Sequence, residues 1–192
     1  MISCLLWIVL IIFATMMSLL QQKNTKKLQD DYMALEIERK FLLRNEDWRK
    51  SISSSSVIRQ GYLAPLDTSS VRVRLDGDKA NINIKSATIG ITRLEYEYAI
   101  PVSDANDMLD TLCRKPQIHK TRHIVLVGQH VWEIDEFYDD NEGLVVAEIE
   151  LTDENEKFVK PEWAGDEVSD DARYYNVNLI ENPYKNWGEV NR

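Results

Sequence analysis

The sequence predicts an α+β protein: a closed, eight-stranded antiparallel β-barrel with covering helices, preceded by an N-terminal apolar helix. The main observation is a series of short segments in which charged and apolar residues alternate, which is the two-residue period of a β-strand. Short turns join these segments, as expected for an antiparallel sheet that curls closed. Segments with a helical apolar stripe are available to cover the sheet. With 192 residues, the chain has room for one such domain and further segments.

Residues 1–22 carry no charged side chain and are almost entirely apolar. Because about twenty helical residues span a bilayer's hydrocarbon core, this segment predicts a transmembrane helix. Lysines between 23 and 27 follow it, and the positive-inside rule then places the rest of the chain in the cytoplasm, tethered to the inner membrane. Residues 23–32 are expected to form a polar tether. The alternative is that the protein starts at Met33 and that the upstream stretch is an over-extended gene start.

The first charged strand is expected within residues 33–43. Glu36, Glu38 and Lys40 share one face of it, and the opposite face is mostly apolar. The apolar face can be buried against a core. Two carboxylates and an ammonium on one strand could be a solvated surface, but the following strands repeat the pattern.

The middle of the chain continues the alternation. The clearest segment places Arg72 and Arg74 on one face and three aliphatic residues on the other, and a hairpin turn follows it. We expect a helical turn over 45–50, a serine-rich loop over 51–56, and strands over 57–63, 71–75, 80–85 and 92–100.

The second half starts with a helix over 104–114 that Ser103 is expected to cap. Strands over 118–127, 130–137 and 144–151 come next. We expect short helices over 154–159, capped by Thr152 or Asp153, and over 169–176, capped by Ser169. The barrel domain is placed at 33–182, and 183–192 is expected to be a loose tail.

The charged faces are sorted by sign. If helices cover the apolar face of the sheet, the charges point into the barrel, the reverse of an ordinary core. Exposed ion pairs contribute at most about 1 kcal/mol, so a surface gains little from sorting. Buried charges need compensation, which a polyanion with a hard divalent cation supplies. The acidic pairs are Glu36/Glu38, Glu95/Glu97, Glu133/Asp135 and Glu148/Glu150, and the basic groups are Lys40, Arg72/Arg74, Lys85, Arg93 and Lys120/Arg122.

Composition excludes several other classes. A net charge of −9 argues against nucleic-acid binding, because phosphate backbones are held by basic surfaces. The glycines are scattered, so the chain lacks a glycine-rich nucleotide loop and a Gly-x-Ser-x-Gly elbow. Two cysteines cannot build a disulfide framework, which fits a reducing compartment.

These motifs together resemble the CYTH superfamily of triphosphate tunnel metalloenzymes over about residues 33–179, and most of all its short bacterial inorganic triphosphatases. A His-Phe pair does not precede residue 36, which argues against the class IV adenylyl cyclases of the superfamily. The chain is also too short for the histidine-rich helical domain of the longer triphosphatases. The matching segments are 36–40, 60–63, 71–74, 84–86, 92–97, 120–122, 132–135 and 147–151, with the ending 165–176.

The resemblance implies metal-dependent hydrolysis of inorganic triphosphate to diphosphate and phosphate inside the tunnel, with Mg²⁺ or Mn²⁺ as cofactor. Lys40 and Tyr62 are the implied catalytic residues, Tyr62 as a proton acceptor. Glu95 and Glu97 are implied for a second metal or for orienting water. The implied phosphate-binding residues are Lys40, Arg72, Arg74, Lys85, Arg93, Lys120 and Arg122, and the implied metal ligands are Glu36, Glu38, Asp135, Glu148 and Glu150.

Five alternatives stay open. One is adenylyl cyclase activity, against which the missing His-Phe pair argues, and another is an acidic β-protein whose charged faces form its exterior. Thiamine triphosphatase and nucleoside triphosphatase activity need the same tunnel with room for an organic group. A non-catalytic polyphosphate-binding module would hold the same anion without releasing phosphate. The sequence does not determine the oligomeric state.

Overall fold

The computed structural model describes residues 35–65 and 68–188. The predicted transmembrane helix over 1–22 and the tether over 23–32 lie outside the described residues. Within the part that the structure describes, no helix has both the length and the hydropathy needed to cross a bilayer.

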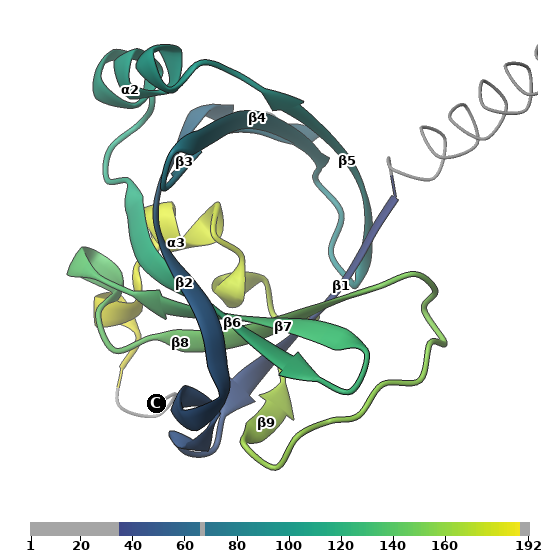
Figure 1. The fold of residues 1–192 in the computed structure, drawn as a ribbon. Coiled ribbons are helices and arrows are strands. Elements are labelled where there is room, and N and C mark those ends of the chain that lie inside the picture. The colour runs from purple at the N-terminus through teal and green to yellow at the C-terminus, as the bar shows by residue number, and fades with distance from the viewer. Residues whose placement is uncertain (1–34, 66–67, 189–192) are drawn as a thin grey trace, which may run out of the picture. The chain divides into compact units, whose positions relative to one another are not determined.

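Eight antiparallel strands form a closed barrel, as the sequence predicts (Figure 1). The strands are β1 (Leu35–Leu43), β2 (Ile52–Pro65), β3 (Ser69–Asp76), β4 (Lys79–Ser86), β5 (Thr92–Ala99), β6 (Ile118–Val127), β7 (His130–Phe137), β8 (Val145–Leu151) and β9 (Ala164–Glu167). Their order is β5-β4-β3-β2-β6-β7-β8-β1-β9, and pairing of β5 with β1 closes the ring. Strand β9 is a short ninth strand on the edge of β1, which the sequence pattern did not predict.

The helical elements are short. They are the α-helices α2 (Val102–Thr111) and α3 (Asn178–Glu181) and the 3₁₀-helices η1 (Asp47–Ser51), η2 (Asp139–Asn141), η3 (Ala172–Tyr174) and η4 (Tyr184–Asn186). Helix α2 lies outside the ring of strands (Figure 1) and buries Ala105 and Leu109 against β3 and β4. Gly61 permits this close packing, because a Cβ there would lie 2.8 Å from Cβ of Cys113.

The apolar core lies on the outer face of β1, β6, β7 and β8. Trp132 stands at its centre, with its ring centroid 5.4 Å from that of Phe41 and 5.2 Å from that of Trp163. Phe158, in the segment between β8 and β9, covers the same ring at 5.9 Å. Because the strands alternate, this outer core leaves their charged faces inside the barrel.

A second apolar cluster closes one end of the barrel interior. On β6, β7 and β8 the inward-facing residue two positions beyond the last charged one is apolar or aromatic, and on β2 Tyr62 lies two positions beyond Gln60. The C-terminal segment, residues 172–187, packs against these residues, and we call it the plug. The cluster joins Tyr62, Ile118, Phe137 and Val146 of the strands to Tyr174, Leu179, Ile180 and Trp187 of the plug.

The β1–β5 seam is short. The two strands pair only from Leu35 to Ile37 of β1. Further along the same edge, the Val168 N–H donates to the carbonyl of Lys40 at 2.9 Å, and the Lys40 N–H donates to Oγ of Ser169 at 3.0 Å. The segment after β9 therefore completes the hydrogen bonding of β1 where β5 has ended.

Several local predictions were wrong. The serine-rich stretch 51–56 belongs mostly to β2, because β6 offers it a partner: Ser54 pairs with Ile124 and Ser56 with Arg122. The first helix is Val102–Thr111 rather than 104–114, and Ser103 does not cap it.

Three C-terminal predictions were also wrong. A turn replaces the helix expected over 154–159, because the Glu156 carboxylate accepts from the backbone and hydroxyl of Thr152. Ser169 does not cap a helix over 169–176, because its hydroxyl is engaged by Lys40; the helical turns are η3 and α3. The tail is not loose up to residue 187, because Trp187 is buried against Tyr174.

Candidate active site

Strand β1 places Glu36, Glu38 and Lys40 on the inner side of the barrel. Lys40 stands opposite Glu148 of β8, and Glu36 stands opposite Arg93 of β5. Partners in antiparallel register point to the same side of the sheet, so the charged faces of neighbouring strands meet in the interior.

The carboxylates of β1 are held by three cations. Lys40 Nζ donates to Glu38 at 2.7 Å and also contacts Glu148. Arg93 reaches both glutamates, at 2.5 Å to Glu36 and 2.7 Å to Glu38. Lys85 of β4 reaches past β5 to Glu36, with Nζ 2.9 and 3.0 Å from its two oxygens. One network thus joins β1, β4, β5 and β8.

Arg122 of β6 is the centre of a second group of ion pairs. Its Nε and Nη2 grip Asp135 at 2.7 and 2.6 Å, and Nη2 also donates to Glu148 at 2.7 Å. Its Nη1 contacts Glu133, and Lys120 pairs with Asp135. Because Glu148 also binds Lys40, the two groups form one continuous network.

The wall formed by β3 and β4 is less completely paired. Arg74 lies 3.1 Å from Glu97, whereas Arg72 lies only within 3.8 Å of Glu95. Asn83 donates to both glutamates, at 2.5 and 2.6 Å. Within residues 35–65 and 68–188, the Nε atoms of both arginines are buried without a hydrogen-bond partner. This wall therefore keeps cationic donors free for a ligand.

The buried charges shift one another's pKa values. Burial would lower the pKa of Lys40, but Glu148 and Glu38 raise it above its usual range. Burial would raise the pKa of Glu148, but Lys40 and Arg122 hold it well below its usual range. Burial, with help from Arg122, lowers the pKa of Lys120 to about 8 in spite of Asp135. These groups are charged near neutral pH, and Lys120 is the one closest to losing its proton.

Glu150 differs from the other inner carboxylates. It stands opposite Glu38, and among the described residues it has no ion-pair or hydrogen-bond partner. Partial removal from water and the charges of Glu36 and Glu133 raise its pKa. Negative charge is therefore in local excess at Glu150, which is a place where a cation is stabilised.

The structure brings the predicted site residues together in one barrel interior. Two of them lie at its margins. Tyr62 packs in the cluster that closes the barrel, where burial raises the pKa of its hydroxyl and the charges of Arg72 and Arg93 oppose that shift. Glu97 lies at the solvent-exposed margin, where the structure pairs it with Arg74 and Asn83.

Residues 34–181 match the CYTH domain. The chain belongs to the CYTH family. CYTH superfamily proteins are metal-dependent enzymes, so the paired cations and carboxylates of the barrel are its candidate active site.

The CYTH chain is similar to two curated relatives over most of its length. It is 50% identical over 157 residues to the inorganic triphosphatase of Acetivibrio thermocellus, covering 82% of this chain and 100% of the relative. It is 34% identical over 148 residues to the inorganic triphosphatase of Nitrosomonas europaea, covering 75% and 95%. A crystal structure of an inorganic triphosphatase aligns with TM-score 0.55 and 29% identity, covering 76% of this chain and 93% of that one.

The carboxylates of the CYTH barrel fit a divalent metal by donor type. Glutamate and aspartate oxygens are the hard ligands that Mg²⁺ and Mn²⁺ take. Among residues 35–65 and 68–188, three or more metal-binding side chains do not converge as they stand. The reason is visible in the network, where Lys40, Arg93 and Arg122 occupy most of the carboxylate oxygens. The unpartnered Glu150 is the donor that needs no rearrangement.

Sequence reasoning left out four polar residues of the interior. The sequence pattern pairs Glu133 with Asp135 without marking it as a site residue, although it binds Arg122. Gln60, Asn81 and Asn83 share faces with Tyr62, Arg74 and Lys85. Alternation could have placed them inside, but neutral amides do not stand out in a search for charge.

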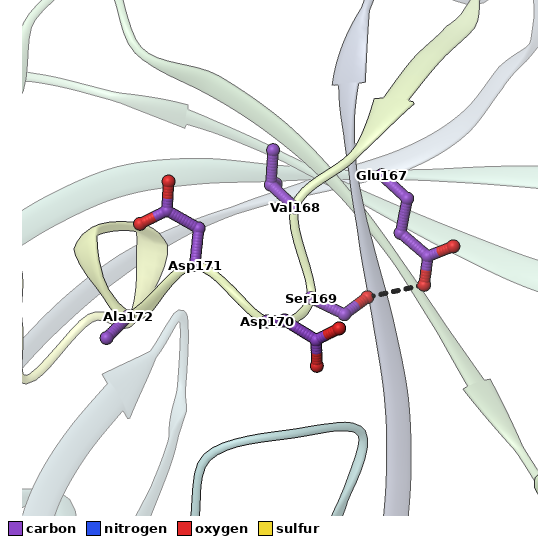
Figure 2. Close-up of a pocket in the computed structure, with 6 residues that line it drawn as sticks. All are labelled: Glu167, Val168, Ser169, Asp170, Asp171 and Ala172. Atoms are coloured by element: carbon purple, nitrogen blue, oxygen red, sulfur yellow. Dashed lines mark hydrogen bonds between the residues drawn. The ribbon is translucent and has the colours of Figure 1, made fainter.

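A pocket of about 550 Å³ lies on the segment that binds the Lys40 backbone (Figure 2). Its lining runs from Glu167 to Ala172 and includes Ser169, whose Oγ donates to Glu167 at 2.7 Å. Half of the six lining residues are acidic and none is basic, so the pocket is unsuited to a phosphate anion. Its relevance to the site is structural, through the bonds to Lys40.

Proposed function

We propose that the protein hydrolyses inorganic triphosphate to diphosphate and phosphate inside the barrel. The observation that carries this proposal is the enclosed set of basic side chains on β1, β3, β4, β5 and β6, interleaved with carboxylates. An apolar substrate gains nothing from such an interior, whereas a polyanion with a divalent cation can replace the internal ion pairs one for one. The similarity to two inorganic triphosphatases supports the same substrate.

In this proposal the cations hold the phosphate oxygens. Arg72 and Arg74 have buried donors without partners, so they can bind the anion without giving up a strong ion pair. The others exchange a carboxylate for a phosphate. The proposed phosphate-binding residues are Lys40, Arg72, Arg74, Lys85, Arg93, Lys120 and Arg122.

The carboxylates released by that exchange would hold Mg²⁺ or Mn²⁺. When bound, such a metal acts as a Lewis acid on phosphate oxygens and on water. We propose Glu150 as the first donor because it is already without a partner. The proposed ligands are Glu36, Glu38, Asp135, Glu148 and Glu150, with Glu95 and Glu97 for a second metal or for orienting water.

The chain's own residues contribute orientation and charge stabilisation. Fixed guanidinium groups offset the negative charge that develops on the leaving diphosphate, and they need no reorganisation during the reaction. Lys40 is the proposed central cation, because its raised pKa keeps it charged. Burial raises the pKa of Tyr62, so its hydroxyl contributes as a neutral hydrogen-bonding group. The Nζ of Lys120, with a pKa of about 8, is the proposed site for holding or releasing a proton.

Phosphate release from tripolyphosphate, thiamine triphosphate and ATP, measured side by side with Mg²⁺, tests this proposal. We expect the highest kcat/KM for tripolyphosphate. A higher kcat/KM for either organic triphosphate would reassign the substrate. Tight tripolyphosphate binding without any phosphate release would instead identify a binding module.

We also propose that residues 1–22 anchor the domain to the cytoplasmic side of the inner membrane. The support is the apolar run and the lysines that follow it. Fractionation of cells expressing the full chain should recover it with the membranes. Recovery in the soluble fraction would contradict the anchor.

A further inference from the structure

Gln60 of β2 has a fully buried amide without any hydrogen bond. The side chain is 0% exposed, and neither Nε2 nor Oε1 has a partner among the residues that the structure describes. Its outward-facing neighbour Gly61 touches helix α2, so Gln60 itself lies on the inner face. Buried amides are normally hydrogen-bonded, and one without any partner requires an explanation.

The unpartnered atoms near Gln60 form a group on one wall. In register, Gln60 stands opposite Arg74 of β3, which stands opposite Asn81 of β4. The adjacent row contains Arg72 and Asn83. Each of these four residues also has one buried polar atom without a partner, namely Nε of Arg72, Nε of Arg74, Oδ1 of Asn81 and Oδ1 of Asn83.

This grouping points to a ligand outside the chain. A methionine or leucine would fill the volume of Gln60 without burying an unpaired amide, so stability alone favours an apolar residue here. The amide of Gln117 shows the ordinary case: it accepts from Nε of Arg59 at 2.9 Å and donates to the carbonyl of Leu109. The difference is that Gln60 faces the tunnel and Gln117 does not.

We propose that Gln60 is a substrate-contacting residue whose Nε2 donates to a non-bridging oxygen of the bound triphosphate. This inference rests on the proposed function and adds to it a neutral donor beside Arg72 and Arg74. Tyr62 and Ile118 of the closing cluster are its neighbours along β2 and across to β6. Gln60 therefore contacts the phosphate unit nearest the closed end of the tunnel. Substrate reaches Gln60 when the cations of the tunnel exchange their carboxylate partners for phosphate.

Gln60→Met is the test variant, and Gln117→Met is the matched control. In Gln60→Met, we expect the free protein to melt at or above the wild-type temperature, since an unpaired buried amide is removed. We expect the KM for tripolyphosphate to rise about 10- to 30-fold, as for one hydrogen bond to a charged group. The rise in melting temperature that tripolyphosphate causes should be correspondingly smaller in Gln60→Met than in the wild type. Gln60→Glu should raise KM further, because a carboxylate repels the anion.

The control should behave in the opposite way. Gln117→Met should lower the melting temperature and leave KM unchanged, since its amide is used inside the fold. A Gln60→Met protein with the wild-type KM and full stabilisation by tripolyphosphate would overturn the inference. A lower melting temperature in Gln60→Met with an unchanged KM would also overturn it, by giving the amide a structural role.

The same measurements separate the inference from the proposed function. If wild-type protein releases no phosphate but is stabilised by tripolyphosphate, and Gln60→Met is not, hydrolysis fails and the contact stands. If tripolyphosphate is neither hydrolysed nor stabilising in the wild type, both are overturned. Hydrolysis by the wild type with no effect of Gln60→Met overturns the contact alone.

Discussion

The backbone N–H of Lys40 donates a 3.0 Å hydrogen bond to Oγ of Ser169, 129 residues further along the chain. The Val168 N–H returns a 2.9 Å bond to the carbonyl of Lys40. Tyr175 extends the contact by donating to the carbonyl of Ser169 at 2.8 Å and accepting from the N–H of Gly90 at 3.0 Å. The lysine at the centre of the charged network is thus positioned by the C-terminal segment, along the edge of β1 that β5 leaves unpaired.

Ser169→Ala should destabilise the protein by about 1–2 kcal/mol. The change leaves the buried Lys40 N–H without its acceptor and Glu167 without one donor. Urea unfolding would measure the loss. Ser53→Ala, which removes an exposed bond to the carbonyl of Ile124, is the control and should change stability by under about 0.5 kcal/mol. Equal effects of the two variants would mean that the hydrogen bond between the Lys40 N–H and Ser169 Oγ does not stabilise the fold.

Lys40→Met should reduce turnover by about 100-fold or more, because the central cation of the network is lost. It should also cost about 3 kcal/mol of stability, since Glu148 and Glu38 lose a buried partner. The double variant Lys40→Met/Glu148→Gln should recover part of the stability and none of the activity.

Lys50→Ala is the control for Lys40, because in the described part of the chain Lys50 makes only an exposed pair with Asp47. Its rate and stability should equal those of the wild type within about 0.5 kcal/mol. Wild-type turnover in Lys40→Met would remove Lys40 from the site.

Glu150→Gln should stabilise the metal-free protein while lowering activity. Partial burial and nearby carboxylates raise the pKa of Glu150, so its ionised form opposes folding at pH values above that pKa. The stabilisation should be on the order of 0.5 kcal/mol near neutral pH, because Glu150 is exposed and screened. The stabilisation should fade as the pH falls through the raised pKa of Glu150. It should vanish below about pH 4.3, the pKa of a glutamate in the unfolded chain.

The activity and metal response of the same variant complete the test. If Glu150 is a metal ligand, Mg²⁺ should raise the melting temperature of the wild type more than that of Glu150→Gln. Full metal stabilisation and full activity in the variant would exclude Glu150 as a ligand.

Trp187→Ala should cost about 3 kcal/mol, measured by thermal or urea unfolding. Trp187 is 5% exposed, packs edge-to-face on Tyr174 with centroids 5.0 Å apart, and donates Nε1–H to the carbonyl of Asn182. Leu126→Ala, at a position that is 62% exposed, should have little effect. A loss of under about 0.5 kcal/mol in Trp187→Ala would mean that the plug adds little to stability.

Charge alternation predicted the barrel well, because it reports directly on two faces with different surroundings. Lys40 opposite Glu148, and Arg122 beside Asp135, follow once strands with charged faces close into a ring. The alternation also contained Gln60 and Asn83, but their importance lies in which atoms lack partners, and only the structure shows that.

Local signals failed where a distant segment competed for the same group. Ser169 has the residue type and position of a helix cap, yet its hydroxyl oxygen accepts from the backbone N–H of Lys40 in β1. The sequence alone predicts a loop for the serines at 54–56, but pairing with β6 makes them part of β2. Trp187 looked like part of a loose tail because its partner Tyr174 comes from another turn of the plug. In each case the deciding contact is non-local.

The measurement that tests the central claim most directly is phosphate release from tripolyphosphate by the full chain, with Mg²⁺, with Mn²⁺ and with EDTA. We expect release with either metal, one diphosphate accumulating for each phosphate, and no release in EDTA. A folded protein that releases no phosphate with either metal, or that releases it equally fast in EDTA, would contradict metal-dependent hydrolysis in the barrel.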